Sequence, residues 1–125
     1  MTVLVADDDP DIIRFVEVNL HLEGYQVEVA RDGQQALDKA LDLQPDLVLL
    51  DVRMPVIDGF TVCSRLRADP RGAGIPVILV TANIPVLADR QRAREVGADD
   101  FVVKPFDPSD LMARVRTLVQ AGRRR

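Results

Sequence analysis

Short apolar runs alternate along the chain with longer stretches in which apolar residues recur every three or four positions. The runs are mostly β-branched or aliphatic, with little alternation of polar positions, and they cover residues 3–6, 27–30, 47–50, 77–80 and 101–103. Such runs are typical of strands that are buried on both faces of a parallel sheet. The second run is more mixed because it contains Glu28, so we expect it to form an edge strand.

Acidic residues and helix breakers mark the ends of the intervening stretches. Asp9 and Asp107 each precede a proline, and Asp58 precedes a third helix-periodic stretch, in positions typical of helix N-caps. Gly24 and Pro45 are expected to end the first two helices.

The stretch at residues 86–96 has the weakest apolar face, and we expect it to form the least firmly docked helix. Five strands, each followed by a helix, predict an α/β fold, a three-layer α/β/α doubly wound sandwich. Functional sites in such sheets lie beyond the carboxyl ends of the strands.

Composition narrows the classes of function. The chain has 125 residues, 47% of them hydrophobic, and a formal net charge of −4. We expect one domain over residues 1–121, with residues 122–125 as a basic tail or the start of a linker. The negative charge argues against nucleic-acid binding as the main role.

The single cysteine, Cys63, excludes an internal disulfide. The first residues show no leader or long apolar run. We therefore expect a cytoplasmic location without a membrane span.

Polar residues follow four of the five predicted strands, and all of them should converge on one edge of the sheet: Asp7, Asp8, Asp51, Thr81 and Lys104. Three carboxylates in one cleft repel each other unless cations neutralise them. Lys104 supplies one positive charge, and Mg²⁺, which prefers carboxylate oxygen, would supply the rest, with Mn²⁺ as an alternative.

Each of these residues also has an ordinary structural explanation. An aspartate after a strand commonly forms a turn or caps a helix, and Lys104 could be a surface lysine beside Pro105. Asp9 fits the cap through its proline, so we leave it out of the site. An aspartate at the end of the apolar run before Asp51 is costly unless it is paired or metal-bound. The five positions together favour a site.

The available nucleophiles narrow the chemistry. His21 falls late in the first helix, and Cys63 lies on a core-facing stripe, so neither is placed to react. The nucleophile is then a carboxylate, and its product is an acyl phosphate. A metal can bridge the carboxylates and a phosphoryl oxygen. Lys104 can pair with a second phosphoryl oxygen, and the Thr81 hydroxyl can donate to a third.

These motifs resemble the receiver domain of two-component response regulators, including the chemotaxis receivers. The matching segments span essentially the whole chain and cover residues 3–9, 46–55, 58–59, 77–82 and 97–106. The resemblance implies a flavodoxin-like parallel sheet of order 2-1-3-4-5. It also implies that Asp51 accepts a phosphoryl group from a phosphohistidine, on a sensor histidine kinase or a histidine phosphotransfer protein, in a phosphorelay signal transduction system.

The resemblance assigns roles at the metal and phosphate sites. Asp8 matches the direct metal ligand and Asp7 the acidic partner that acts through water, beside Asp51 itself. The backbone carbonyl of Arg53 matches a further ligand. Lys104 matches one phosphate-contacting residue. On this basis the chain is a phosphoprotein that carries an aspartyl phosphate, and not an enzyme, although it assists its own phosphorylation and dephosphorylation.

Three further residues match positions that transmit the signal. Thr81 matches the second phosphate-contacting residue, and Ala82 matches a small residue that leaves room for the phosphate. Phe101 matches an aromatic switch coupled to Thr81, where tyrosine is often found. Phenylalanine can still move between two positions but lacks the hydroxyl hydrogen bond, and Phe101 could instead be a core aromatic. The family implies that the fourth helix, fifth strand and fifth helix change their surface to control a downstream effector protein or a fused output domain.

A group of charged residues suggests an interface. Arg90, Asp100, Asp110 and Arg114 resemble the pattern through which receivers of DNA-binding regulators form homodimers, although the same residues also suit an ordinary solvated surface.

Three alternative functions compete with the interpretation of this chain as a phosphoacceptor. A phosphatase of the haloacid dehalogenase type also uses an aspartyl nucleophile, but it needs an acid where this chain has Arg53. A flavodoxin-like cofactor binder needs a hydroxyl-rich loop after the first strand, where this chain has acids. A receiver-like adaptor that has lost phosphorylation would not need all the site positions, which are intact here.

Overall fold

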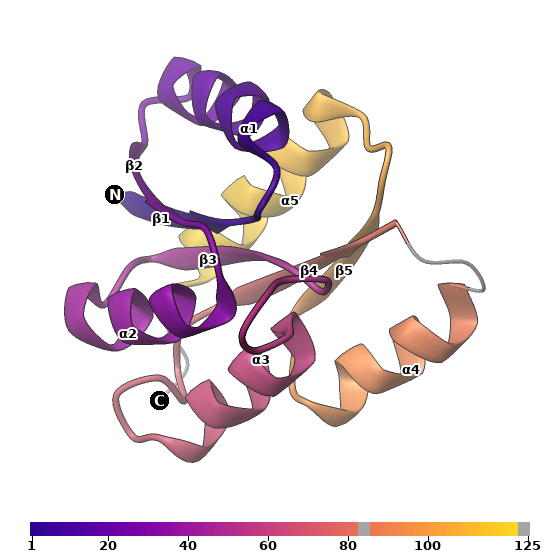
Figure 1. Cartoon of the computed structure of the whole chain (residues 1–125). Coiled ribbons are helices and arrows are strands. Elements are labelled where there is room, and N and C mark those ends of the chain that lie inside the picture. The colour runs from indigo at the N-terminus through magenta and orange to yellow at the C-terminus, as the bar shows by residue number, and fades with distance from the viewer. Residues whose placement is uncertain (83–85, 123–125) are drawn as a thin grey trace.

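A single parallel sheet forms the centre of the molecule (Figure 1). The structure is a computed structural model that describes residues 1–82 and 86–122. Within these residues the sheet has five strands in the order β2-β1-β3-β4-β5, which confirms the expected topology and the edge position of the mixed strand. The strands are β1 (Thr2–Ala6), β2 (Gln26–Ala30), β3 (Leu47–Asp51), β4 (Val77–Thr81) and β5 (Asp100–Val103).

Helices cover both faces of this sheet, as the doubly wound fold predicts. In the described part of the chain they are α1 (Pro10–Leu22), α2 (Gly33–Leu43), α3 (Gly59–Ala68), α4 (Val86–Glu95) and α5 (Pro108–Ala121). The helices α1 and α5 lie on one face, and α2, α3 and α4 lie on the other (Figure 1). None of these described helices has the length and apolar character needed to cross a bilayer.

Successive residues of each strand contribute to opposite layers of the core. Val3 and Val5 of β1 pack in the cluster that includes α1 and α5 residues, whereas Leu4 and Ala6 pack in the cluster on the α2–α4 side. Adjacent strand residues point to opposite faces of a sheet. Because both faces of β1, β3, β4 and β5 are covered by apolar side chains, these four strands appear in the sequence as apolar runs, whereas the edge strand β2 alternates exposed and half-buried residues.

The predicted helix caps are present. Asp9, Asp58 and Asp107 precede α1, α3 and α5, and each accepts a hydrogen bond from a backbone N–H in the first turn of its helix. Gly24 follows the end of α1 with φ of +92°, a left-handed conformation that glycine adopts without steric cost. The caps fix where each helix begins relative to the end of the preceding strand.

Gly59 allows α3 to begin very close to the end of β3. Its backbone N–H donates to the carbonyl of Val52 at 2.8 Å. A Cβ atom at this position would lie 2.4 Å from the backbone oxygen of Asp51, far inside van der Waals contact. A side chain would therefore push α3 away from the strand end that carries Asp51.

The helix α4 makes a limited contribution to the core. Among its described side chains, Ala93 is the buried apolar one and Asp89 is the buried polar one. These two residues are four positions apart and so lie on the same face of the helix. This small apolar contact accords with the weak periodicity of the sequence, while the prediction that α4 is the least firmly docked helix stays a prediction.

Candidate functional site

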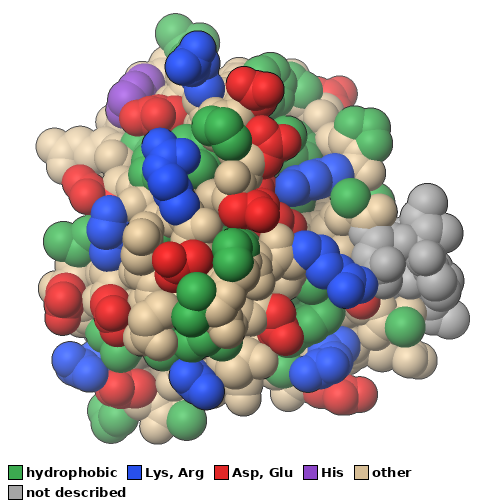
Figure 2. Space-filling model, viewed as in Figure 1, with side chains coloured by type: hydrophobic (Ala, Val, Ile, Leu, Met, Phe, Trp, Pro, Cys, Tyr) green, Lys and Arg blue, Asp and Glu red, His purple; other side chains and the backbone are tan. Residues whose placement is uncertain are grey.

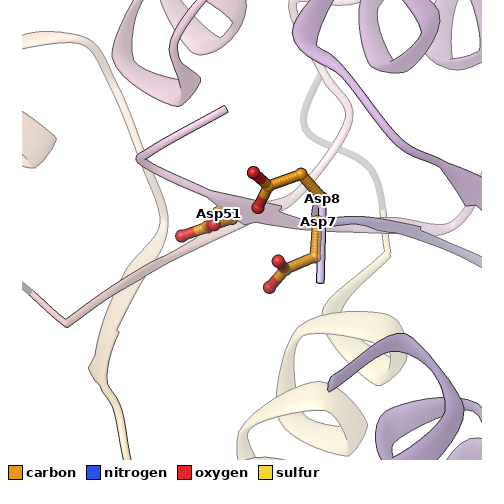
Figure 3. Close-up of side chains that lie close together, drawn as sticks. All are labelled: Asp7, Asp8 and Asp51. Atoms are coloured by element: carbon orange, nitrogen blue, oxygen red, sulfur yellow. The ribbon is translucent and has the colours of Figure 1, made fainter. Parts of the chain in front are cut away.

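Acidic side chains from two neighbouring strands meet at the carboxyl edge of the sheet (Figure 3). Asp7 and Asp8 follow β1, Asp51 ends β3, and the two strands pair in parallel up to Ala6 and Leu50. Among the described residues, one carboxylate oxygen from each of these three aspartates lies within 4.8 Å of the others. Asp7 is 4% exposed and Asp51 is 5% exposed, whereas Asp8 faces solvent. The edge thus combines two buried carboxylates with one accessible carboxylate.

Lys104 reaches the same cluster from the segment after β5. Its Nζ donates to Asp7 Oδ2 at 2.9 Å and lies 3.6 Å from Asp51 Oδ2. Burial acts to lower the pKa of Lys104, but the hydrogen bond to Asp7 and the charge of Asp51 outweigh it and leave the pKa above its ordinary value. Lys104 is therefore a permanent cation between the two buried carboxylates.

The neighbouring groups do not fully offset the cost of a negative charge on Asp51. Burial and then repulsion by Asp7 raise the pKa of Asp51 to about 6, and Lys104 opposes the rise only in part. The backbone N–H of Arg53 also donates to Asp51 Oδ1, with a donor–acceptor distance of 3.4 Å. The ionised form of Asp51 is therefore disfavoured by its burial and by the charge of Asp7, and a cation bound at the cluster would offset both effects.

This arrangement fits a hard divalent cation. The clustered donors are carboxylate oxygens, the type that Mg²⁺ prefers, and the exposed Asp8 leaves the cluster open to solvent. Asp9 lies beside the cluster but serves the helix: its side chain accepts from the N–H of Asp11, and its own N–H donates to Asp7 Oδ1 at 3.0 Å. These contacts confirm that Asp9 caps α1, while its exclusion from the site stays a prediction.

Thr81 ends β4, as expected, but its hydroxyl is engaged with a residue that the sequence did not single out. Thr81 is fully buried, and its Oγ1 donates to Oδ2 of Asp89 on α4 at 2.9 Å. Asp89 is 7% exposed. In the sequence it is one of several charged residues on a weakly amphipathic helix. Its spacing of four residues from Ala93 is the signal that would have placed it on the inner face.

Phe101 lies in the core in this structure. The residue is 8% exposed within the apolar cluster on the α2–α4 side, and the guanidinium of Arg90 lies 5.3 Å from the ring centroid. A switch residue in its inward position and a permanent core aromatic would both occupy this place. Ala82, the expected small residue at the phosphate entrance, follows Thr81 and is exposed.

The charged group expected at an interface is partly paired within the chain. Arg114 donates to Asp100 at 2.8 Å and to Asp110 at 3.0 Å, while Arg90 stacks on Phe101 instead. On the face shown in Figure 2, acidic and basic side chains are interspersed. The expectation that the domain does not bind nucleic acid directly stays a prediction.

Comparison with known families agrees with the fold. The model of the response regulator receiver domain matches residues 3–116. The chain belongs to the response regulator receiver family. This membership confirms the resemblance read from the motifs, and it places the chain among signalling domains of two-component systems rather than among dehalogenase-type phosphatases or flavin binders.

Relatives and solved structures give the same picture. The DNA-binding dual master transcriptional regulator RpaA of Synechocystis is 47% identical over 118 residues, which cover 94% of this chain and 48% of the relative. A response regulator from Chloroflexus aurantiacus superposes with a TM-score of 0.89 at 35% identity, covering 95% of this chain and 97% of that one.

A further neighbour bears on the metal. The receiver domain of the sensor histidine kinase PA1611 from Pseudomonas aeruginosa has magnesium coordinated in its active-site cleft, and it superposes with a TM-score of 0.87 at 31% identity over 95% of this chain and 97% of that one. Among the curated relatives, the chain spans about half the length of the first matches.

Proposed function

We propose that this domain is a phosphoacceptor switch in which Asp51 receives a phosphoryl group from a phosphohistidine of a sensor histidine kinase or a histidine phosphotransfer protein. The observation that carries the proposal is the position of Asp51: a buried carboxylate at a strand end, flanked by Asp7 and Asp8 and 3.6 Å from the ammonium of Lys104. At neutral pH its pKa of about 6 leaves most of the population ionised and nucleophilic.

The chemistry follows from these groups. A carboxylate oxygen of Asp51 attacks phosphorus, the P–N bond of the phosphohistidine breaks, and its electron pair returns to the imidazole nitrogen. Asp7, Asp8, Asp51 and the carbonyl of Arg53 would hold Mg²⁺ or Mn²⁺, which when bound offsets the negative charge of the carboxylates and the phosphoryl oxygens. Lys104 pairs with a phosphoryl oxygen and so stabilises the charge that arrives at the site.

Transmission begins at Thr81. A phosphoryl group on Asp51 adds charge and strong hydrogen-bond acceptors at the end of β3. The Thr81 hydroxyl turns toward this group, and Ala82 keeps the approach open. Phe101, which already lies in the core cluster, then repacks around the space that Thr81 leaves. The surface formed by α4, β5 and α5 then differs between the two states and is read by an effector or an output domain.

Acceptance of the phosphoryl group is tested by mass. Wild-type protein incubated with a small phosphodonor and Mg²⁺ is expected to gain one phosphoryl group in an intact-mass spectrum, and a chelator should suppress the gain. A protein that gains none under any condition would be a receiver-like adaptor, and the proposal would be wrong.

Hydrogen exchange tests the switch. A phosphoryl mimic with Mg²⁺ is expected to change amide protection within residues 86–106, most of all in α4, because this helix has the smallest described apolar contact with the sheet. The α1 amides serve as the internal reference. Identical protection of the switch segment in both states would rule out transmission by this route.

The output and assembly are further parts of the proposal. Because relatives such as RpaA are about twice as long and carry the name of DNA-binding regulators, we propose that this cytoplasmic domain controls a fused output domain or a separate effector. Residues 122–125 would form a basic tail or the start of a linker. Residues 123–125 lie outside the described part of the chain.

Activated domains would pair through α4, β5 and α5, with Arg90 and Arg114 near the contact. Sedimentation that shows only monomers after activation would remove this interface.

A further inference from the structure

The buried acid Asp89 is the least expected feature next to the site. Its side chain is more than nine-tenths buried, yet it comes from a helix whose other described polar residues face solvent. Burying a carboxylate is costly unless hydrogen-bond donors compensate. The Thr81 hydroxyl provides such a donor, with 2.9 Å between Oγ1 and Oδ2. The chain thus places an acid where it captures the hydroxyl that the proposed switch needs.

We propose that Asp89 is a positioning residue that holds the Thr81 hydroxyl toward α4 in the unphosphorylated state and thereby opposes activation. This inference rests on the proposed function and concerns its regulation. A threonine hydroxyl has one O–H to donate. The hydroxyl can therefore donate to Asp89 or to a phosphoryl oxygen on Asp51, but not to both, and the two acceptors compete for it.

The competition also explains how a local event reaches α4. When Thr81 donates to the phosphoryl group, Asp89 loses that donor while its carboxylate is still shielded from water. A buried charge that loses its partner raises the free energy of the packed state. The first turn of α4 relieves this cost by moving outward until water solvates Asp89. Rotation of one hydroxyl is thereby converted into displacement of a helix.

The neighbouring residue couples this displacement to the aromatic ring. Arg90 follows Asp89 in the sequence, and its guanidinium lies 5.3 Å from the centroid of Phe101. Outward movement of this turn carries Arg90 away from the ring and changes the environment of Phe101. Asp89 and Arg90 together connect Thr81 and Phe101 through consecutive residues of α4.

Titration with beryllofluoride and Mg²⁺, followed by calorimetry, tests the inference. Asp89→Ala removes the competing acceptor, so the variant is expected to bind the mimic about tenfold more tightly than wild type, the size expected for one hydrogen bond to a charged group. Asp89→Asn keeps an uncharged acceptor and should fall between them. Glu95→Ala, which removes an exposed acid from the same helix, is the matched control and should bind like wild type.

A double-mutant cycle separates the hydrogen bond from a general effect of charge. In a Thr81→Val background, Asp89→Ala is expected to leave the affinity for beryllofluoride unchanged, because the shared hydroxyl is absent. An equal gain in both backgrounds would overturn the inference. Thermal unfolding verifies that each variant is folded, and Asp89→Asn replaces Asp89→Ala in the cycle if the alanine variant is not.

The outcomes also distinguish this inference from the function on which it rests. If wild type binds the mimic and Asp89→Ala binds no more tightly than Glu95→Ala, Asp89 does not oppose activation, although Asp51 still serves as the acceptor. If wild type shows no binding at all, both the proposed function and the inference fail.

Discussion

Replacing Asp51 with asparagine is expected to abolish uptake of the phosphoryl group, so that the intact mass of the variant is unchanged after incubation with a small phosphodonor and Mg²⁺. The amide has almost the same shape as the carboxylate but lacks the anionic oxygen that attacks phosphorus and becomes part of the acyl phosphate. The neighbouring carboxylates of Asp7 and Asp8 stay in place. Because the oxygen that would form the acyl phosphate is absent, uptake of the phosphoryl group is expected to be lost completely.

Asp9→Asn is the matched control for this experiment. Asp9 lies next to the acidic cluster, but its side chain accepts from the N–H of Asp11 at the start of α1. Asparagine is an equally good N-cap, so the fold should be retained. This variant is expected to gain one phosphoryl group as wild type does. Continued uptake by Asp51→Asn would show that another residue is the acceptor and would overturn the assignment.

Four of the strands, β1, β3, β4 and β5, were predictable because they are buried on both faces, whereas the edge strand β2 alternates exposed and half-buried residues before Ala30. Val3 and Leu4 are adjacent in the sequence and pack in different layers of the core, so both must be apolar and the run is visible without any knowledge of the fold. The order of the strands was not predictable in this way. The strands have four or five residues each, and such similar lengths do not give their order. Apart from the edge position expected for the mixed run, the order came from the family resemblance.

The convergence of Asp7, Asp51 and Lys104 was predictable from topology alone. Parallel strands end at the same edge, so polar residues directly after them become neighbours although they are far apart in the sequence. The 2.9 Å contact between Lys104 and Asp7 joins positions 97 residues apart. The sequence did not reveal which of these groups has a raised pKa, because the pKa depends on burial and on distances between side chains.

Asp89 was missed for a physical reason. The apolar signal that fixes the rotation of a helix is weak in α4, where Ala93 is the buried apolar residue among the described side chains. Without that signal, an acid among several charged residues is read as solvated. The direction of the Thr81 hydroxyl was also hidden, because it depends on a rotamer and on the partner that α4 supplies.

The contribution of Asp51 to the stability of the protein without divalent cations is expected to fall as the pH rises from about 4 to about 7. The pKa of Asp51 is raised from 3.8 to about 6 in the folded protein, whereas the unfolded chain keeps the ordinary value. The folded state therefore holds this proton more tightly. As the pH rises between the two values the unfolded state releases its proton first, which favours unfolding, and the penalty is fully present above the folded pKa.

A shift of this size corresponds to about 3 kcal/mol, since each pKa unit is worth about 1.4 kcal/mol. Asp51 is only 5% exposed, so little of this effect is lost to solvent screening. Asp51→Asn has no charge to desolvate and keeps a similar shape. The variant is therefore expected to be about 2–3 kcal/mol more stable than wild type at pH 7.5, with the difference close to zero at pH 4.

Urea denaturation of both proteins with a chelator, at pH 4 and at pH 7.5, measures this difference. Comparing the two proteins at each pH removes the contributions of all other titrating groups, which they share. Asp110→Asn removes an exposed acid on α5 and should show no comparable gap. Saturating Mg²⁺ should narrow the gap at pH 7.5, because a cation that binds the folded wild type offsets the charge of Asp51. A stability difference that is the same at both pH values would mean that Asp51 carries no unrelieved charge, and the electrostatic basis for a cation at this edge would be lost.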